Sequence, residues 1–63
     1  MLQENLTKYR EKRGYSKLYL SRISGVSREK IKQIELNPNQ NVTIATLEKL
    51  AKALKITVQD LIK

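Results

Sequence analysis

The chain has 63 residues, 40% of them apolar, and its 13 Lys and Arg against six Asp and Glu give a formal net charge of +7. It contains no cysteine and no histidine, which are the usual disulfide, metal-binding and general-base residues, so we expect no enzyme activity, no metal site and no cofactor. We expect one small domain over residues 1–63.

The charge and hydropathy patterns indicate the kind of partner. Residues 1–35 carry nine bases and four acids, net +5, and residues 36–63 carry four bases and two acids, net +2. A positive field of this density favours a polyanionic partner, although a solvated basic surface would give the same count. No apolar run approaches the ~20 residues that cross a bilayer, and the chain does not begin with a signal-peptide pattern. We therefore expect a cytoplasmic protein.

Apolar residues at helical spacing predict a first helix over residues 2–13, which ends before Gly14. Arg10 projects close to Leu6, inside the apolar stripe, where an unpaired guanidinium would be strongly destabilising. Glu35 lies at the margin of the inward face of a later helix. Two interpretations of these residues remain open: they form an ion pair that joins the two helices, or each reaches water.

Two short amphipathic segments follow, Lys17–Ser24 and Arg28–Ile34, joined by the turn Gly25-Val26-Ser27. Ser16 and Ser27 are placed to accept hydrogen bonds from the first backbone N–H groups of the two helices. Glycine allows the chain to reverse with a positive φ at little steric cost. The pattern therefore predicts two helices and a tight turn.

At about 100° per residue, each of these helices has an inward and an outward face. We expect Leu20, Ile23 and Ser24 on the inward face of the first helix, and Ile31 and Ile34 on that of the second. The outward face of the second is a contiguous patch of long polar side chains, suited to base edges in the DNA major groove: Arg28, Glu29, Lys32 and Gln33. In the first helix, we expect Leu18 to be an ordinary exposed leucine and Tyr19 to lie at the margin of the core.

The remaining chain predicts a loop and two helices. Residues 36–41 (LNPNQN) lack periodicity, and their amides either bind phosphate oxygens or serve only as turn residues. Thr43 is expected to cap a helix whose apolar stripe is Ile44, Leu47, Leu50, Ala51 and Leu54. Thr57 and Asp60 resemble a capping box, which opens a short final helix with Val58, Leu61 and Ile62. That helix closes the core and offers a surface for a two-fold interface.

Taken together, these segments resemble the phage repressor and Cro-type helix-turn-helix (XRE) family. The resemblance rests on LTKYREKRGYS, LSRISGVSREKIKQIE and TIATLEKLAKALKITVQDLI, which cover nearly the whole chain. It implies an all-α, compact five-helix domain of the lambda-repressor type, with the helix-turn-helix as its second and third helices. It also favours the ion pair between Arg10 and Glu35.

The resemblance further implies cytoplasmic binding of double-stranded DNA by a homodimer on a pseudo-palindromic operator. Because 63 residues leave no room for a separate ligand-sensing domain, we expect no small-molecule effector. Carried over by position, the four outward residues face bases, Ser27 contacts the DNA backbone or a base, and Lys17 stands at a phosphate-binding position. We also expect backbone contacts from Ser16 and from the loop residues Asn39 and Asn41. Lys17 replaces the glutamine usual in the family, and we expect it to bind phosphate as a point charge. Lys55 replaces a glycine, and Glu29 must accept from cytosine N4 or pair with Arg28 or Lys32.

The preferred hypothesis is a sequence-specific transcriptional regulator, most simply a repressor, that acts by operator occupancy. A protein-interaction module, such as an antitoxin or anti-repressor, is the alternative. A third is a cationic nucleic-acid binder without sequence preference. Salt dependence and competitor DNA distinguish the three.

Overall fold

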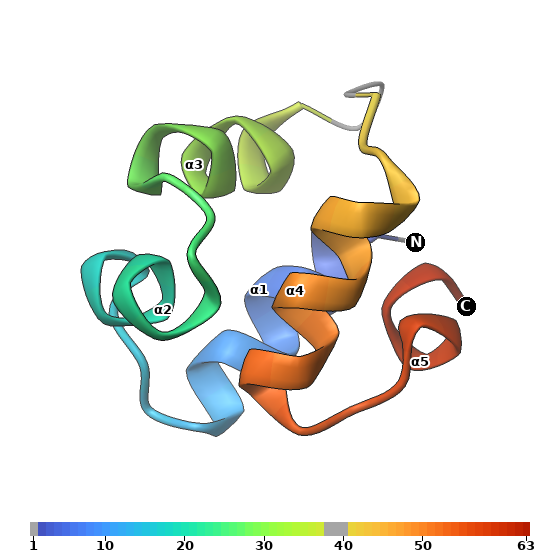
Figure 1. Cartoon of the computed structure of the whole chain (residues 1–63). Coiled ribbons are helices and arrows are strands. Elements are labelled where there is room, and N and C mark those ends of the chain that lie inside the picture. The colour runs from blue at the N-terminus through green and yellow to red at the C-terminus, as the bar shows by residue number, and fades with distance from the viewer. Residues whose placement is uncertain (1, 38–40) are drawn as a thin grey trace.

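The computed structural model describes residues 2–37 and 41–63. These residues form the predicted all-α fold of five helices (Figure 1), and the predicted helix bounds are correct to within one or two residues. In chain order the helices are α1 (Leu2–Lys12), α2 (Lys17–Ser24), α3 (Arg28–Leu36), α4 (Ile44–Leu54) and α5 (Val58–Ile62).

The helices α2 to α5 each begin at a hydroxyl side chain, as the sequence predicts. Ser16 Oγ accepts from the Tyr19 N–H at 3.0 Å and Ser27 Oγ from the Lys30 N–H at 3.1 Å. Thr43 Oγ1 accepts from the Thr46 N–H at 3.2 Å. The capping box at α5 is complete, because Thr57 Oγ1 accepts from the Asp60 N–H and an Asp60 carboxylate oxygen accepts from the Thr57 N–H. These bonds satisfy N–H groups that lack a partner within the helix.

Three helix ends among the described residues are followed by a residue with left-handed backbone geometry. Gly14 follows α1 at φ 75°, in line with the prediction that the first helix ends before it. Gly25 ends α2 at φ 78°, as predicted for the turn that separates α2 from α3. Lys55 ends α4 at φ 59° and ψ 43°, and its N–H donates to the carbonyls of Ala51 and Lys52. Glycine adopts this geometry freely, whereas a side chain there costs roughly 1–2 kcal/mol. The α4–α5 turn is therefore mildly strained.

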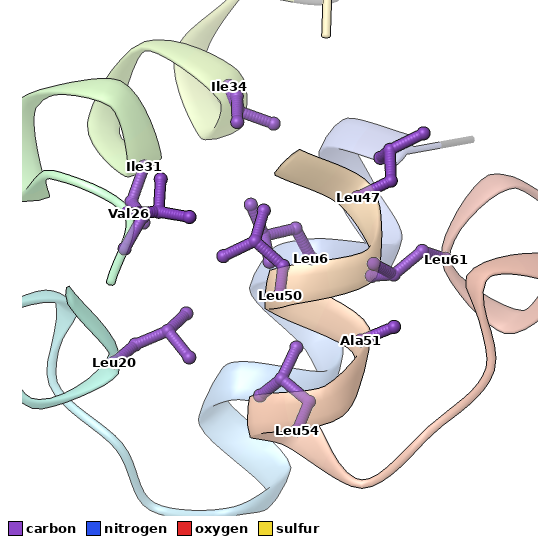
Figure 2. Close-up of a cluster of buried hydrophobic side chains, with 10 residues drawn as sticks. All are labelled: Leu6, Leu20, Val26, Ile31, Ile34, Leu47, Leu50, Ala51, Leu54 and Leu61. Atoms are coloured by element: carbon purple, nitrogen blue, oxygen red, sulfur yellow. The ribbon is translucent and has the colours of Figure 1, made fainter. Parts of the chain in front are cut away.

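The core lies where all five helices meet, and Figure 2 shows Leu6 of α1 and Leu50 of α4 at its centre. α1 contacts α3 and α5, α2 contacts α3 and α4, and α4 contacts α5. Burying each large aliphatic side chain contributes about 1.5–3 kcal/mol. The buried apolar residues are Leu6, Leu20, Val26, Ile31, Ile34, Leu47, Leu50, Ala51, Leu54 and Leu61.

Two positions predicted to face inward, Ile23 and Ile44, are wrong, and Tyr19, predicted at the margin of the core, is half exposed. Ile23 of α2 is 42% exposed, Ile44 at the start of α4 is 64% exposed, and Tyr19 is 49% exposed. Each projects in the expected direction on its helical wheel, but no neighbouring helix covers it there. Tyr19 instead places its ring against that of Tyr15, with 4.9 Å between the ring centroids. Ile62 of the short final helix is 51% exposed as well.

α1 is also joined to the ends of α4 and α5 by side-chain hydrogen bonds that the helical wheels do not predict. The Asn5 amide donates to the carbonyls of Leu61 (2.8 Å) and Lys63 (3.0 Å). Arg13 Nε donates to the Leu54 carbonyl at 3.0 Å. Carbonyls at a helix C-terminus lack intrahelical donors, so these contacts satisfy groups that would otherwise need water. Among residues 2–37 and 41–63, no helix is long and apolar enough to span a membrane.

Candidate nucleic-acid interface

The orientation of α3 is set by apolar packing on one side and by a buried ion pair at its end. Ile31 and Ile34 are buried, so the opposite face of the helix turns outward. Arg10 of α1 donates through Nε to one Glu35 carboxylate oxygen at 2.7 Å and through Nη2 to the other at 3.0 Å. The ion pair predicted from the sequence is therefore present, and it is bidentate.

The same arginine also fixes the connection between α1 and α2. Arg10 Nη1 donates to the Tyr15 carbonyl at 2.9 Å. The Arg10 side chain is 12% exposed and that of Glu35 is 5% exposed, so neither charge is well solvated. The hydrogen bond to Glu35 raises the pKa of Arg10 above its ordinary value, which keeps the guanidinium charged. One side chain thus holds α1, the start of α2 and the end of α3 together.

The predicted base-reading residues all lie on the exposed face of α3: Arg28, Glu29, Lys32 and Gln33. No ion pair joins Glu29 to Arg28 or Lys32 within the part of the chain that the structure describes. Of the two roles expected for Glu29, pairing with a neighbouring cation is therefore not realised in the protein alone. Its carboxylate remains available to accept a hydrogen bond from outside.

The outward face of α3 and the start of α2 line one open groove of about 560 Å³. Residues 16–18 line it from the N-cap and first turn of α2, while Arg28, Glu29 and Lys32 line it from α3. Arg10 of the ion pair also lines it. The groove thus brings the predicted phosphate ligand Lys17 next to the predicted base readers. Three cations of these two helices and one carboxylate share this surface, which therefore carries a net positive charge.

The other predicted backbone contacts divide into three groups. The hydroxyls of Ser16 and Ser27 accept helix-capping hydrogen bonds, and each retains its O–H to donate to a phosphate oxygen. Asn41 is exposed, and its carbonyl accepts from Lys30 Nζ at 3.4 Å. Asn39 lies outside the described residues.

Sequence reasoning missed three features of this surface. Leu18 was expected to be an ordinary exposed leucine, yet it lines the same groove as Lys17 and Arg28. Lys30 is half-buried, and its ammonium group contacts the loop after α3. A second open groove, of about 390 Å³, extends the outward face to the C-terminal end of α3, where Leu36 and Asn37 complete it. Only the position of Leu18, directly after the predicted phosphate ligand Lys17, gave a signal in the sequence.

Comparison with known proteins identifies the fold family. The Helix-turn-helix family model matches residues 6–61, which is most of the chain. The chain belongs to the phage repressor and Cro-type helix-turn-helix family. The helix-turn-helix itself consists of α2, the turn at Gly25 and α3.

Its relatives within the family include the transcriptional regulator SinR. The HTH-type transcriptional regulator SinR of Bacillus subtilis (strain 168) is 32% identical over 62 residues, which are 98% of this chain and 56% of the relative. SinR of Bacillus licheniformis gives the same values. The chain thus spans about half the length of the curated relatives that it matches.

Solved structures of SinR share the whole fold of this helix-turn-helix domain. A crystal structure of SinR, described as the master regulator for biofilm formation, in complex with DNA matches with a TM-score of 0.93 and 32% identity, covering 100% of both chains. The solution structure of the N-terminal DNA-binding domain of SinR from Bacillus subtilis matches with a TM-score of 0.87, at 32% identity, over 100% of this chain and 91% of that one. A complex of the SinR and SinI proteins matches with a TM-score of 0.92, also at 32% identity, over 100% of this chain and 61% of that one.

Proposed function

We propose that this protein is a sequence-specific transcriptional regulator, acting as a repressor, that binds double-stranded DNA through α3 and acts by operator occupancy. One observation carries the proposal: the four long polar side chains on the outward face of α3 are exposed and share a groove system with Lys17 at the start of α2. A helix presented in this way fits the major groove of B-DNA, where the edges of all four base pairs can be distinguished. The SinR structure with DNA supports it, because the match covers all of both chains.

Each side chain has a role that follows from its chemistry. Arg28 and Lys32 carry donors suited to guanine O6 and N7, and Gln33 can form a bidentate pair with adenine N6 and N7. Glu29, which lacks a cationic partner among the described residues, accepts from cytosine N4. Lys17, together with the hydroxyls of Ser16 and Ser27 and the exposed Asn41, holds the phosphate backbone and sets the register.

A single domain of this size reads only a few base pairs, so we include a homodimer on a pseudo-palindromic operator in the proposal. The two recognition helices are then expected about 34 Å apart, one turn of B-DNA. The exposed Ile62 of α5 lies on the surface suggested for the two-fold contact. Sedimentation of the protein with and without an operator duplex measures this stoichiometry.

Selection from random duplexes, followed by binding titrations at several salt concentrations, tests the function. We expect a preferred pseudo-palindromic site and an affinity that falls steeply with salt. Arg28→Ala should remove about 1–3 kcal/mol of preference at one base step, whereas Lys17→Ala should weaken all duplexes equally and reduce the salt slope by about one. An equal, sequence-independent loss in both variants would mean that the readers are wrongly assigned.

A protein-interaction module is a second candidate, because SinR has also been solved in a complex with the SinI protein. Exposed apolar side chains such as Leu36 and Ile44 are available for an interface of this kind. Binding to a protein partner through apolar contacts would change little with salt, and no duplex would be enriched in the selection.

A further inference from the structure

Leu18 is a large apolar side chain in a groove that is otherwise polar and charged. It is 46% exposed and lines the α2–α3 groove together with Lys17, Arg28 and Lys32. An isolated exposed leucine is ordinary on a protein surface. This one, however, lines the same groove as the side chain proposed to bind phosphate and three of the side chains proposed to face bases.

The direction of Leu18 is fixed by the burial of α2. Leu20, two residues further on, is fully buried and holds the opposite face of the helix against the core. Leu18 therefore cannot turn inward without unpacking α2. The cap at Ser16 fixes the first turn that carries it, because Ser16 Oγ accepts from the Tyr19 N–H. The backbone that carries Leu18 is therefore already ordered before a ligand covers the side chain.

The major groove of DNA exposes one apolar group on a base edge, the C5-methyl group of thymine. We propose that Leu18 is a specificity-determining residue that contacts a thymine methyl group beside the base step read by Arg28. This proposal rests on the function proposed above. The remaining lining of the groove donates and accepts hydrogen bonds, so Leu18 supplies the apolar contact that it otherwise lacks.

The test compares thymine with uracil, which differs only by that methyl group. The preferred duplex is first selected with the unchanged protein, and each thymine is then replaced singly by uracil. We expect one position in each half-site to lose affinity by about fourfold, because burying one methyl group contributes about 0.8 kcal/mol. Fluorescence anisotropy at constant salt measures each affinity.

The Leu18→Ala variant decides whether Leu18 makes the contact. It should bind the thymine duplex less tightly, and the thymine-to-uracil change at the sensitive position should then have no effect. Ile23→Ala is the matched control, because Ile23 lies on the same helix with a similar exposed fraction, 42%, and does not line the groove. That control should retain the full fourfold difference. Thermal unfolding of both variants shows whether the fold is kept.

The outcomes separate this inference from the proposed function. If selection enriches no duplex, the proposed function fails. If a site is enriched but no thymine is sensitive, or if Leu18→Ala retains the uracil effect, only the role of Leu18 is wrong. A uniform loss on all duplexes in Leu18→Ala would identify a contact with the sugar-phosphate backbone, which also overturns the inference.

Discussion

The two sides of α1 are held to the rest of the molecule by different chemistry. Toward α2 and α3, Arg10 forms a buried bidentate ion pair with Glu35 and also binds the Tyr15 carbonyl. Toward α4 and α5, the side chains of Asn5 and Arg13 bind helix-terminal carbonyls. A buried ion pair is highly sensitive to the loss of one partner, whereas a capped carbonyl can turn to water instead.

The two halves of the molecule differ in how strictly the positions of their helices are fixed. The α2–α3 half carries the proposed reading surface, and a charged, bidentate contact allows little freedom of orientation. The α4–α5 half closes the core, where a shift of the helix ends moves none of the side chains of α2 and α3 that are proposed to contact DNA. Substitutions in the two halves should therefore differ both in size and in their effect on DNA binding.

The largest effect is expected from Arg10→Met. It leaves the Glu35 carboxylate, 5% exposed, without its cation, which should cost about 3–5 kcal/mol of unfolding free energy and lower DNA affinity by displacing α3. Urea unfolding measures the first and duplex titration the second. The double variant Arg10→Met with Glu35→Leu should recover most of the stability, because no buried charge remains. If the single variant costs less than about 1 kcal/mol, the pair does not hold α3.

Asn5→Ala should have a smaller effect, confined to the other half. It removes two hydrogen bonds to the end of α5 and should cost about 1–2 kcal/mol. The affinity for a duplex that holds a single half-site, measured at a temperature where the variant is folded, should stay unchanged, and amide exchange should accelerate in α5. Lys12→Ala, an exposed change on the same helix, serves as the control and should lie within about 0.5 kcal/mol of the original protein. Loss of DNA affinity in Asn5→Ala would show that the two halves are coupled.

Opposite substitutions in two turns, Gly to Ala and Lys to Gly, should have smaller effects on stability. Gly25→Ala should destabilise by about 1 kcal/mol through backbone strain alone, because a Cβ built there has no atom within 4 Å. Lys55→Gly should change stability by less than that, because relief of the left-handed strain at φ 59° is offset by the greater freedom of glycine in the unfolded chain. Thermal unfolding measures both. A large stabilisation by Lys55→Gly would indicate more strain in the α4–α5 turn than its angles imply.

The smallest effect concerns pH and Asp60 of α5. The hydrogen bond from the Thr57 backbone N–H lowers the pKa of Asp60 in the folded state. The unfolded chain therefore binds the proton more readily, so the contribution is present above the ordinary pKa of about 3.9 and is lost as the pH falls through the lower folded value. Asp60→Asn should have a lower melting temperature than the original protein at pH 7, and the difference should shrink as the pH falls below about 3.9. Glu48→Gln controls for the loss of one negative charge.

The sequence predicted the contacts that depend on local spacing. Capping by Ser16, Ser27 and Thr43 follows from hydroxyls placed just before amphipathic segments, and the positive φ of Gly25 follows from a turn between two of them. Helical wheels indicate that Arg10 and Glu35 could pair, because each charge lies beside an apolar stripe. The family resemblance then favoured the ion pair over two solvated side chains.

Contacts that depend on how far a neighbouring helix extends were not predictable. A helical wheel gives the direction in which Ile23 and Ile44 project, but not whether another helix lies on that side. Both side chains are exposed. The bonds from Asn5 to the end of α5 join residues 56 and 58 positions apart, and polar residues on a helix surface carry no sign of such partners. The position of Leu18 in the groove also depends on how α2 and α3 pack together, so only the structure shows it. The base-reading assignments remain predictions.

The bond between Asn5 and the Lys63 carbonyl also has a practical consequence for biophysical measurements. It holds the start of α1 and the end of α5 together, on the side of the molecule away from α2 and α3 (Figure 1). The sequence contains no cysteine, so Lys63→Cys would introduce a unique thiol. A fluorophore attached to it could report rotation of the protein on a duplex without standing between α3 and the bases.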